Sequence, residues 1–370
     1  MSTALHSSTF EIRPASTTLS DAERAVRLDK PGFGRIFTEH MASLRYTEGQ
    51  GWHSGVLGPY EPLMMDPASS VLHYGQAIFE GFKAYHQPKD GSLRTFRPYE
   101  NARRFNNSAR RLAMPDLPED LFVEAADLLI RQDRLWVPKE IGHSLYLRPL
   151  MIGTEAALGV RPSKEYLFLM LASPAGAYFA GGVKPVTVWV TEDYVRAAPG
   201  GTGFAKCAGN YAASLLAQKQ AHDKGCDQVV WLDAINRKFV EEMGGMNICF
   251  VYKEHGKTIL VTPKLTGTLL PGITRASLLQ LAQDLGYEAE ERRISVDFWD
   301  KDLADGRMTE VFACGTAAVL TPIGVVKSRM GTWVVNNGET GPVAAQLRKA
   351  LVNLQHGLAP DPHGWMHDVC

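Results

Sequence analysis

The sequence lacks any long apolar run. No stretch approaches the roughly 18–20 uninterrupted apolar residues that a membrane-spanning helix requires, and the first residues carry no apolar segment of the kind that marks a secretory signal. These absences argue against helical membrane spans and secretion, and we expect a cytoplasmic protein.

An excess of charge of one sign is also missing. Lys and Arg together number 39 and Asp and Glu 40, and the basic residues cluster only as pairs such as Arg110-Arg111. A nucleic-acid interface or a polybasic membrane surface needs a longer basic stripe. We therefore expect neither nucleic acid nor a membrane as a partner.

Cysteine is scarce, and its five positions lie far apart with no C-x-x-C motif. An odd and scattered set of thiols fits reduced cysteines better than a disulfide framework or a structural zinc site. We expect no bound metal. The cysteines are Cys207, Cys226, Cys249, Cys314 and Cys370.

The length of 370 residues exceeds the roughly 250–300 at which a single hydrophobic core usually stops growing. Apolar residues make up 45% of the chain, which is enough for packed cores. A Gly/Ala-rich segment at 173–182 marks the best boundary between two domains. We divide the chain into a loose, Ser/Thr-rich N-terminal arm and three further parts: the arm at 1–32, a small domain at 33–174, an interdomain loop at 175–184 and a large domain at 185–370.

Strand and helix patterns mix in both halves without the strict repetition of a βαβ fold, so we expect an α+β fold in each. Strands are predicted at 144–152, 166–172, 185–191, 228–233, 238–242, 247–252 and 310–314. Helices are predicted at 100–112, 119–133, 211–224, after Thr274, and at 343–354. In the helix at 211–224, Ala212, Leu215 and Leu216 fall on one side, and Gly225 stands as a C-cap.

The most suggestive segment is Gly-rich and runs from Ala198 to Asn210. It is not a phosphate-binding P-loop, because Lys206 has Ala205 before it and Cys207 after it, where that motif needs Gly and Ser or Thr. A dinucleotide fingerprint fails as well, because Lys206 occupies the third glycine position. A flexible loop with a surface lysine remains the simple alternative.

The surroundings of Lys206 favour chemistry. It is the only charged residue between Arg196 and Lys219, and it lies among glycine, alanine and aromatic residues. A lysine kept from water is a nucleophile of the kind that forms Schiff bases. Glu241-Glu242 is a second unusual patch, where a carboxylate pair ends a strand and runs into two glycines; a solvated strand end is the alternative.

Two segments suit an anion. Residues 271–274 open a helix, whose first N–H groups and dipole favour negative charge, and residues 315–317 follow a strand with a small turn that offers N–H groups and a hydroxyl. Taken alone, each is more often ordinary capping. Arg104 is expected on a helix, where it is interpreted, taken alone, as a surface charge. The composition of the aromatic run at 73–81 does not distinguish it from residues of the hydrophobic core.

Nine segments, in their order and spacing, are similar to the branched-chain amino acid aminotransferases, which are fold type IV pyridoxal-phosphate enzymes. The resemblance extends from about Phe33 to near the C-terminus and implies a two-domain fold like that of D-amino acid aminotransferase. The segments are Phe33–Met41, Leu72–Tyr85, Phe96–Leu112, Ser144–Pro149, Ser173–Phe179, Gly200–Tyr211, Glu241–Asn247, Leu270–Arg275 and Phe312–Ala317.

The resemblance implies a cofactor, pyridoxal 5'-phosphate. Lys206 would form a Schiff base with it and, once released, move the proton between the substrate α-carbon and the cofactor. Glu242 matches the carboxylate that bonds the pyridine nitrogen, so that the ring accepts electrons. Tyr211 matches the hydroxyl that faces the phenolate oxygen. The phosphate site is matched by Arg104, Ile273, Thr274 and Thr316.

The resemblance also implies the substrates, namely L-leucine, L-isoleucine or L-valine with 2-oxoglutarate, giving branched-chain 2-oxo acids and L-glutamate. Amides at Thr316-Ala317 would hold the α-carboxylate, and Arg148 would offer a handle for the second carboxylate of glutamate. Lys83 is expected near the pocket without an assigned role. Pocket residues are matched by Phe33, Tyr74, Phe79, Tyr146, Arg148, Tyr178, Thr316 and Ala317.

Alternatives on the same fold are a D-amino acid aminotransferase and an aminodeoxychorismate lyase, and a non-catalytic binding protein would need Lys206 or Glu242 to be missing. Family members are homodimers, so we expect at least a dimer. The chain departs from animal mitochondrial relatives at their redox C-x-x-C, where Ala318 and Thr321 stand. We therefore expect no thiol switch of that kind. Gly245 also stands where some animal relatives carry Thr.

Overall fold

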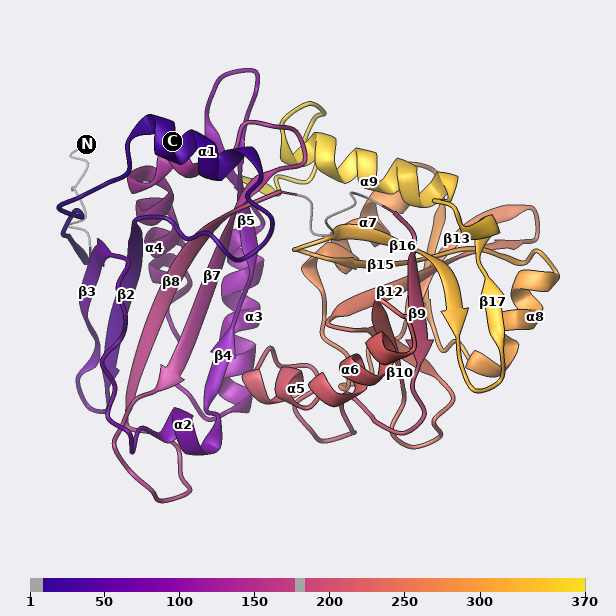
Figure 1. Cartoon of the computed structure of the whole chain (residues 1–370), viewed down its shortest axis with the longest axis horizontal. Coiled ribbons are helices and arrows are strands. Elements are labelled where there is room, and N and C mark those ends of the chain that lie inside the picture. The colour runs from indigo at the N-terminus through magenta and orange to yellow at the C-terminus, as the bar shows by residue number, and fades with distance from the viewer. Residues whose placement is uncertain (1–8, 177–183, 370) are drawn as a thin grey trace. The chain divides into compact units, whose positions relative to one another are not determined.

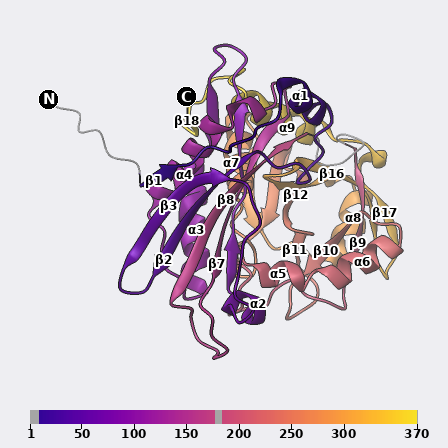
Figure 2. The same cartoon turned by 60° about the vertical axis from the view of Figure 1, so that its left-hand side comes forward.

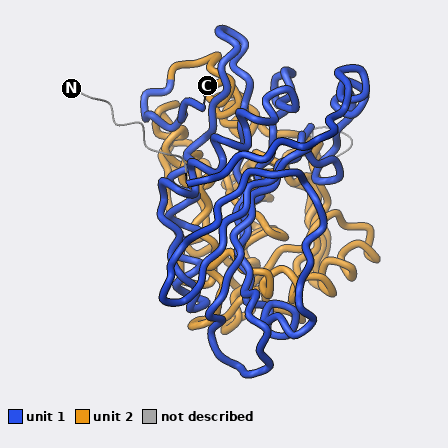
Figure 3. The backbone as a smooth tube through the Cα atoms, turned by 90° about the vertical axis from the view of Figure 1, so that its left-hand side faces the viewer, with its two compact units in different colours: residues 1–176, 361–370 blue, residues 177–360 orange. Residues whose placement is uncertain are grey.

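The computed structural model describes residues 9–176 and 184–369. The chain divides into two compact units (Figure 3). Unit 1 comprises residues 1–176 and 361–370, and unit 2 comprises residues 177–360. No helix in the described part of the chain combines the length and apolar character needed to cross a membrane.

Unit 1 is built on a nine-stranded sheet in the order β1-β3-β2-β8-β7-β5-β6-β18, with β4 paired to β7. The strands are β1 (Phe10–Ile12), β2 (His40–Thr47), β3 (Gly51–Pro59), β4 (Ala77–Phe79), β5 (Phe82–His86), β6 (Leu93–Phe96), β7 (Ser144–Gly153), β8 (Glu165–Ala175) and β18 (Met366–Asp368). The helices are α1 (Asp21–Asp29), α2 (Ser70–Tyr74), α3 (Pro98–Arg111) and α4 (Glu119–Gln132), with a 3₁₀ turn at Arg134–Trp136.

The core of unit 1 forms where α3 and α4 pack on each other and α4 packs on β2 and β8 (Figure 1). Phe105 of α3, Phe122 of α4 and Phe168 of β8 have ring centroids within 6.1 Å of one another. All three rings are fully buried. Burial of large aromatic side chains is the main stabilising term for such a layer.

Unit 2 has a second nine-stranded sheet in the order β11-β10-β9-β16-β15-β12-β13-β14, with β17 paired to β16. Because β11 pairs with β12 as well as β10, six of these strands close into a ring. The strands are β9 (Val186–Val190), β10 (Gln228–Leu232), β11 (Val240–Met243), β12 (Met246–Glu254), β13 (Lys257–Pro263), β14 (Glu288–Arg292), β15 (Met308–Gly315), β16 (Val319–Lys327) and β17 (Thr332–Val334).

The helices of unit 2 are α5 (Ala208–Ala212), α6 (Leu215–Asp223), α7 (Ile273–Asp284), α8 (Trp299–Ala304) and α9 (Pro342–Gln355), with 3₁₀ turns at Val296–Phe298 and Asn336–Gly338. Mixed sheets and helices in both units confirm the α+β prediction, and each predicted strand overlaps an observed one. The helices predicted at 100–112, 119–133 and 343–354 are α3, α4 and α9. The helix predicted after Thr274 is α7, which begins two residues earlier than predicted, at Ile273, so that Thr274 lies within it.

The helix predicted at 211–224 is wrong in two respects. First, it is two helices, α5 and α6 (Figure 1 and Figure 2). The hydroxyl of Ser214 donates to the carbonyl of Tyr211 at 2.6 Å, and such local bonds compete with helical ones. The predicted apolar side is also different, since Leu215 and Leu216 are 68% and 53% exposed. The residues that α6 buries are Ala217 and Ala221.

Both ends of the described chain belong to unit 1. The described part of the predicted N-terminal arm, from residue 9 on, has regular structure, because β1 pairs with β3 and α1 begins with a capping box of Ser20 and Glu23. At the other end, β18 pairs with β6, and residues 361–370 belong to unit 1, although the prediction assigned them to the large domain. Most of the predicted interdomain loop, residues 177–183, lies outside the described residues.

Candidate active site

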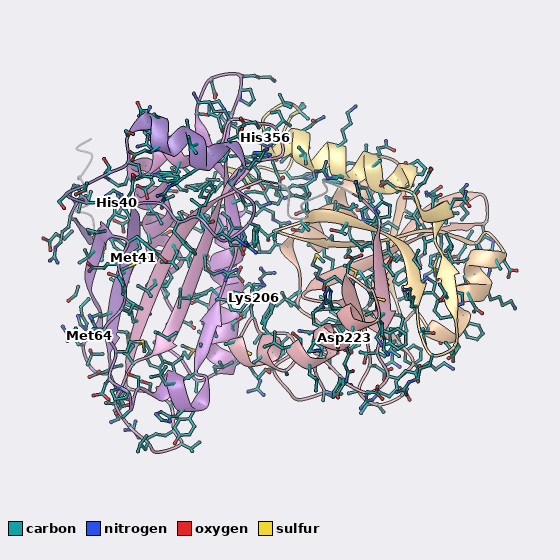
Figure 4. The ribbon with its side chains drawn as sticks, in the orientation of Figure 1. His40, Met41, Met64, Lys206, Asp223 and His356 are labelled. Carbon is teal, nitrogen blue, oxygen red and sulfur yellow. The ribbon has the colours of Figure 1, made fainter. Side chains whose placement is uncertain are left out.

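Lys206 lies directly before α5, half-buried, at the end of the Gly-rich segment (Figure 4). Its Nζ donates to the hydroxyl of Tyr211 at 3.0 Å and lies 5.4 Å from the centre of that ring. The segment is an ordered turn, because the side-chain amide of Asn210 donates to the backbone carbonyls of Thr202 at 2.8 Å and Ala205 at 2.9 Å. This geometry contradicts the alternative of a flexible loop with a surface lysine.

Glu242 projects from β11 and is 2% exposed, so the alternative of a solvated strand end is wrong. Its Oε1 accepts the backbone N–H of Leu270 at 2.7 Å and the side-chain amide of Asn247 at 3.4 Å. Its Oε2 lies 3.1 Å from Nε of Arg196. Burial raises the pKa of the Glu242 carboxyl group, and the Arg196 guanidinium opposes that shift.

Strand register places the turn at 315–317 at the same end of the sheet as Glu242. Glu242 pairs with Asn247 across β11 and β12, and Asn247 pairs with Cys314 across β12 and β15. Because β15 ends at Gly315, the half-buried Thr316 and Ala317 follow directly. The three strands therefore gather Glu242 and this turn side by side.

The start of α7 is attached to the same place. The first N–H groups of a helix have no intrahelical acceptor. In α7 the N-cap is Gly272, which has no side chain that could accept from them. Ile273 is half-buried and Thr274 buried. The bond from Leu270 to Glu242, just before the helix, fixes its start beside the carboxylate.

Tyr211 approaches the turn between β11 and β12. A Cβ at Gly245 would lie 3.2 Å from Cε1 of the Tyr211 ring. Thus unit 2 brings together six of the predicted cofactor residues: Lys206, Tyr211, Glu242, Ile273, Thr274 and Thr316.

Unit 1 brings together four of the predicted pocket residues. The rings of Phe33 and Tyr146 meet edge to face with centroids 4.9 Å apart. The guanidinium of Arg148 lies over the ring of Phe79 at 4.9 Å, and its Nη2 donates to the hydroxyl of Tyr146 at 3.1 Å. The result is an aromatic cluster that holds one cation in a fixed direction.

Arg104, on α3 of unit 1, is not a surface charge. It forms a buried two-point ion pair with Glu80, with Nε to Oε1 at 2.7 Å and Nη2 to Oε2 at 2.8 Å. Glu80 is completely buried. Such a pair gives the guanidinium one orientation.

Of the remaining predicted residues, Lys83 lies opposite Tyr146, Tyr74 lies at the end of α2, and Tyr178 is not among the described residues. Tyr74 is 43% exposed at the end of α2, and its hydroxyl donates to the carbonyl of Leu158. Lys83 is buried on β5 and pairs with Tyr146 of β7. Tyr178 lies outside the described residues.

One group of possible metal ligands occurs among the described residues, namely Glu39, His40 and Asp133. Hydrogen bonds already use these atoms. Nδ1 of His40 lies 2.6 Å from Asp133, and its Nε2 accepts the backbone N–H of Ala15 at 3.0 Å. Glu39 accepts the indole N–H of Trp136 at 2.8 Å. The group therefore holds the N-terminal segment on unit 1.

Sequence reasoning missed three buried polar residues that hold the site, namely Arg196, Asn247 and Glu80. Arg196 carried a signal, because it is the nearest charge before Lys206 in an otherwise uncharged stretch. Glu80 lies in an aromatic run, where a charged side chain needs a partner if it is buried. The partner itself, 24 residues away, is visible only in the fold.

The family of the chain follows from comparison with known proteins. The model of the amino-transferase class IV family matches residues 77–326. The chain belongs to the class IV aminotransferases, and so it is an enzyme of transamination.

Curated relatives and solved structures narrow the class. The probable branched-chain-amino-acid aminotransferase of Streptomyces coelicolor is 61% identical over 362 residues, 98% of this chain and 99% of the relative. The branched-chain-amino-acid aminotransferase of Mycolicibacterium smegmatis is 56% identical over 358 residues, 96% of this chain and 97% of the relative. Within class IV, the chain belongs to the branched-chain-amino-acid aminotransferases, which confirms the resemblance.

Two crystal structures share the fold. That of the Escherichia coli branched-chain amino acid aminotransferase has a TM-score of 0.72 at 30% identity and covers 89% of this chain and 100% of its own. That of a second branched-chain amino acid aminotransferase, complexed with N-(5'-phosphopyridoxyl)-L-glutamate, has a TM-score of 0.70 at 30% identity and covers 89% of this chain and 99% of its own.

Proposed function

We propose that this protein transfers the amino group of L-leucine, L-isoleucine or L-valine to 2-oxoglutarate, using pyridoxal 5'-phosphate. The observation that carries the proposal is the grouping in unit 2 of a lysine amine, a phenol 3.0 Å from it and a carboxylate that is 2% exposed. The first N–H groups of α7, in the same unit, have no side-chain cap from Gly272 and suit a phosphate. These donors and acceptors fit the functional groups of the cofactor.

When bound, pyridoxal phosphate supplies an electron sink for the carbanion formed at the substrate α-carbon. Nζ of Lys206 would hold the cofactor and, once released, would move the proton at the substrate α-carbon. The hydroxyl of Tyr211, which accepts from Nζ, would donate to the phenolate oxygen. The carboxylate of Glu242 would accept a hydrogen bond from the protonated ring nitrogen, and Ile273, Thr274 and Thr316 would bind phosphate oxygens. Arg104 is proposed as a further phosphate ligand.

The proposed substrate site uses both the aromatic rings and the guanidinium of the unit 1 cluster. The rings of Phe33, Phe79 and Tyr146 suit a branched aliphatic side chain. The guanidinium of Arg148 suits the second carboxylate of glutamate, and its bond to Tyr146 keeps it in place. Amides at Thr316-Ala317 are proposed for the α-carboxylate, and Tyr74 and Tyr178 as further pocket residues. Such a site accepts apolar and acidic side chains in alternate half-reactions.

We further propose that the enzyme works in the cytoplasm as a homodimer and serves branched-chain amino acid biosynthesis. The family resemblance supports these points. The direction of the reaction follows the metabolite concentrations in the cell.

The test is the visible absorption of the purified protein with pyridoxal phosphate, before and after addition of L-leucine, with D-alanine in a parallel sample. We expect L-leucine to convert the cofactor to its pyridoxamine form and D-alanine to leave it unchanged. Conversion by D-alanine alone would move the substrate class to a D-amino acid aminotransferase. A protein that binds no cofactor would contradict the proposal altogether.

A further inference from the structure

Arg196 is a buried cation with no assigned role. It lies between β9 and the Gly-rich segment, and its side chain is 7% exposed. Nη2 donates to the carbonyl of Gly203 at 2.9 Å and to that of Thr268. Nε lies 3.1 Å from Oε2 of Glu242. One guanidinium thus connects the segment that carries Lys206, the loop before α7 and the carboxylate.

Glu242 needs such a partner. Taking an isolated carboxylate out of water is so costly that the group ordinarily takes up a proton instead. The N–H of Leu270 and the amide of Asn247 are neutral donors and offset only part of this cost. The charged groups that act on Glu242 are Arg196 and Lys206, which favour the ionised form, and Glu241, which opposes it.

Arg196 also acts electrostatically on Glu241, but among the described residues its ion pair is with Glu242. Glu241 precedes Glu242 on β11, so its side chain points to the opposite face of the strand. There its Oε1 accepts the hydroxyl of Thr268. Arg196 is therefore the cation in contact with Glu242, since no other ion pair to that carboxylate occurs among residues 9–176 and 184–369.

We propose that Arg196 is a positioning residue that keeps Glu242 ionised, and that it thereby decides the protonation of the cofactor ring. An ionised Glu242 accepts a hydrogen bond, so it favours a ring nitrogen that carries a proton. A protonated Glu242 donates instead, so it favours a ring nitrogen without one. The last step rests on the proposed function, whereas the ionisation of Glu242 does not.

The first measurement uses the full chain freed of cofactor at neutral pH and compares infrared difference spectra. We expect the difference spectrum of wild type minus Glu242→Gln to contain a carboxylate band and to lack the band of a protonated carboxyl group. Arg196→Met is expected to gain one protonated carboxyl band per chain, absent from Arg196→Met/Glu242→Gln. Arg196→Lys keeps the charge and is expected to gain less of that band. Arg329→Met, which removes an exposed partner of Asp193, is the matched control and is expected to show no change.

A protonated Glu242 in the wild type, or an ionised Glu242 in Arg196→Met, overturns the inference. If Arg196→Met does not fold, the wild-type spectrum and the charge-free variant Arg196→Gln still decide. A protonated Glu242 in the wild type, or an unchanged carboxylate in Arg196→Gln, contradicts the inference.

The second measurement adds ¹⁵N-labelled pyridoxal phosphate and follows the ring nitrogen by NMR. A protonated nitrogen in wild type that loses its proton in Arg196→Met supports the last step. A neutral nitrogen in wild type overturns that step alone. Failure to bind the cofactor contradicts the proposed function, so the two failures are distinguishable.

Discussion

The buried pair of Glu80 and Arg104 permits a quantitative prediction about unit 1. Both side chains are almost completely removed from water, at 0% and 8% exposure, and two charge-assisted hydrogen bonds join them. Oε2 of Glu80 also accepts the N–H of Gly81 at 3.1 Å. Removing the carboxylate leaves a guanidinium that the fold buries without its counter-charge.

The expected cost follows from that geometry. Breaking a buried ion pair from one side costs about 3–5 kcal/mol of unfolding free energy, and we expect this loss for Glu80→Ala. Glu80→Gln retains the volume and one acceptor, so we expect about 1.5–3 kcal/mol, the worth of a hydrogen bond to a charged group. Glu80→Leu combined with Arg104→Met should cost less than Glu80→Ala, because no unpaired charge remains.

The assay is urea denaturation of the cofactor-free protein followed by far-ultraviolet circular dichroism, since bound cofactor would add its own stabilisation. The control is Asp116→Ala, which breaks an exposed ion pair with Arg110 near the end of α3, the helix that carries Arg104. This change should lower the free energy of unfolding by at most about 1 kcal/mol. A cost for Glu80→Ala equal to that of the control would refute the reasoning. So would a double variant whose cost equals the sum of the single ones.

Four further expectations concern unit 2. Lys206→Ala should abolish transamination with an unchanged circular dichroism spectrum, whereas Lys219→Ala, which removes an exposed lysine, should leave turnover near that of wild type. Gly203→Ala should destabilise the Lys206 segment and weaken cofactor binding in a titration, because the new Cβ would lie 2.2 Å from the carbonyl oxygen of Thr268. Peroxide at neutral pH should leave Cys314 unmodified in mass spectra, because its hydrogen bond with Cys249 and burial raise the pKa of its thiol and keep it protonated; rapid, reversible inactivation that a Cys314 substitution abolishes would count against this. Burial raises the pKa of Glu310 above its ordinary 4.5, so the folded state holds this proton more tightly than the unfolded state. The free energy of unfolding should therefore fall as pH rises from 4.5 to the pKa of Glu310 in the folded state. Glu310→Gln should flatten this dependence on pH in denaturation midpoints measured over the same pH range.

The sequence predicted most of the secondary structure because local signals determined it. Val186–Val190 alternates apolar residues with a period of two, and α3 has a proline at its first position. Where a local bond competed, as at Ser214, the pattern of apolar residues misled. The pairing of β18 with β6 could not be predicted, because it joins residues some 270 positions apart through backbone bonds that carry no residue code.

The site was predictable in its motif residues and not in the residues that support them. Lys206, Glu242 and the start of α7 each have a local signature, such as a lone charge or a helix N-terminus. Arg196 acts through Glu242, 46 positions later, and Glu80 through Arg104 on another element. These partners are set by how strands and loops pack, which spacing along the chain does not encode.

The glycines near Glu242 show how a feature of the sequence follows from packing in the fold. The Gly-rich segment before Lys206 suggested either flexibility or a phosphate loop, yet close packing explains it better. A Cβ at Gly203 would overlap the carbonyl oxygen of Thr268, the atom that also accepts from Arg196. A Cβ at Gly272 would lie 1.9 Å from Oδ1 of Asn247, the residue beside Glu242. The missing side chains let two loops, the Gly-rich segment and the loop before α7, approach one buried carboxylate. Backbone groups and a single guanidinium then hold that carboxylate in place.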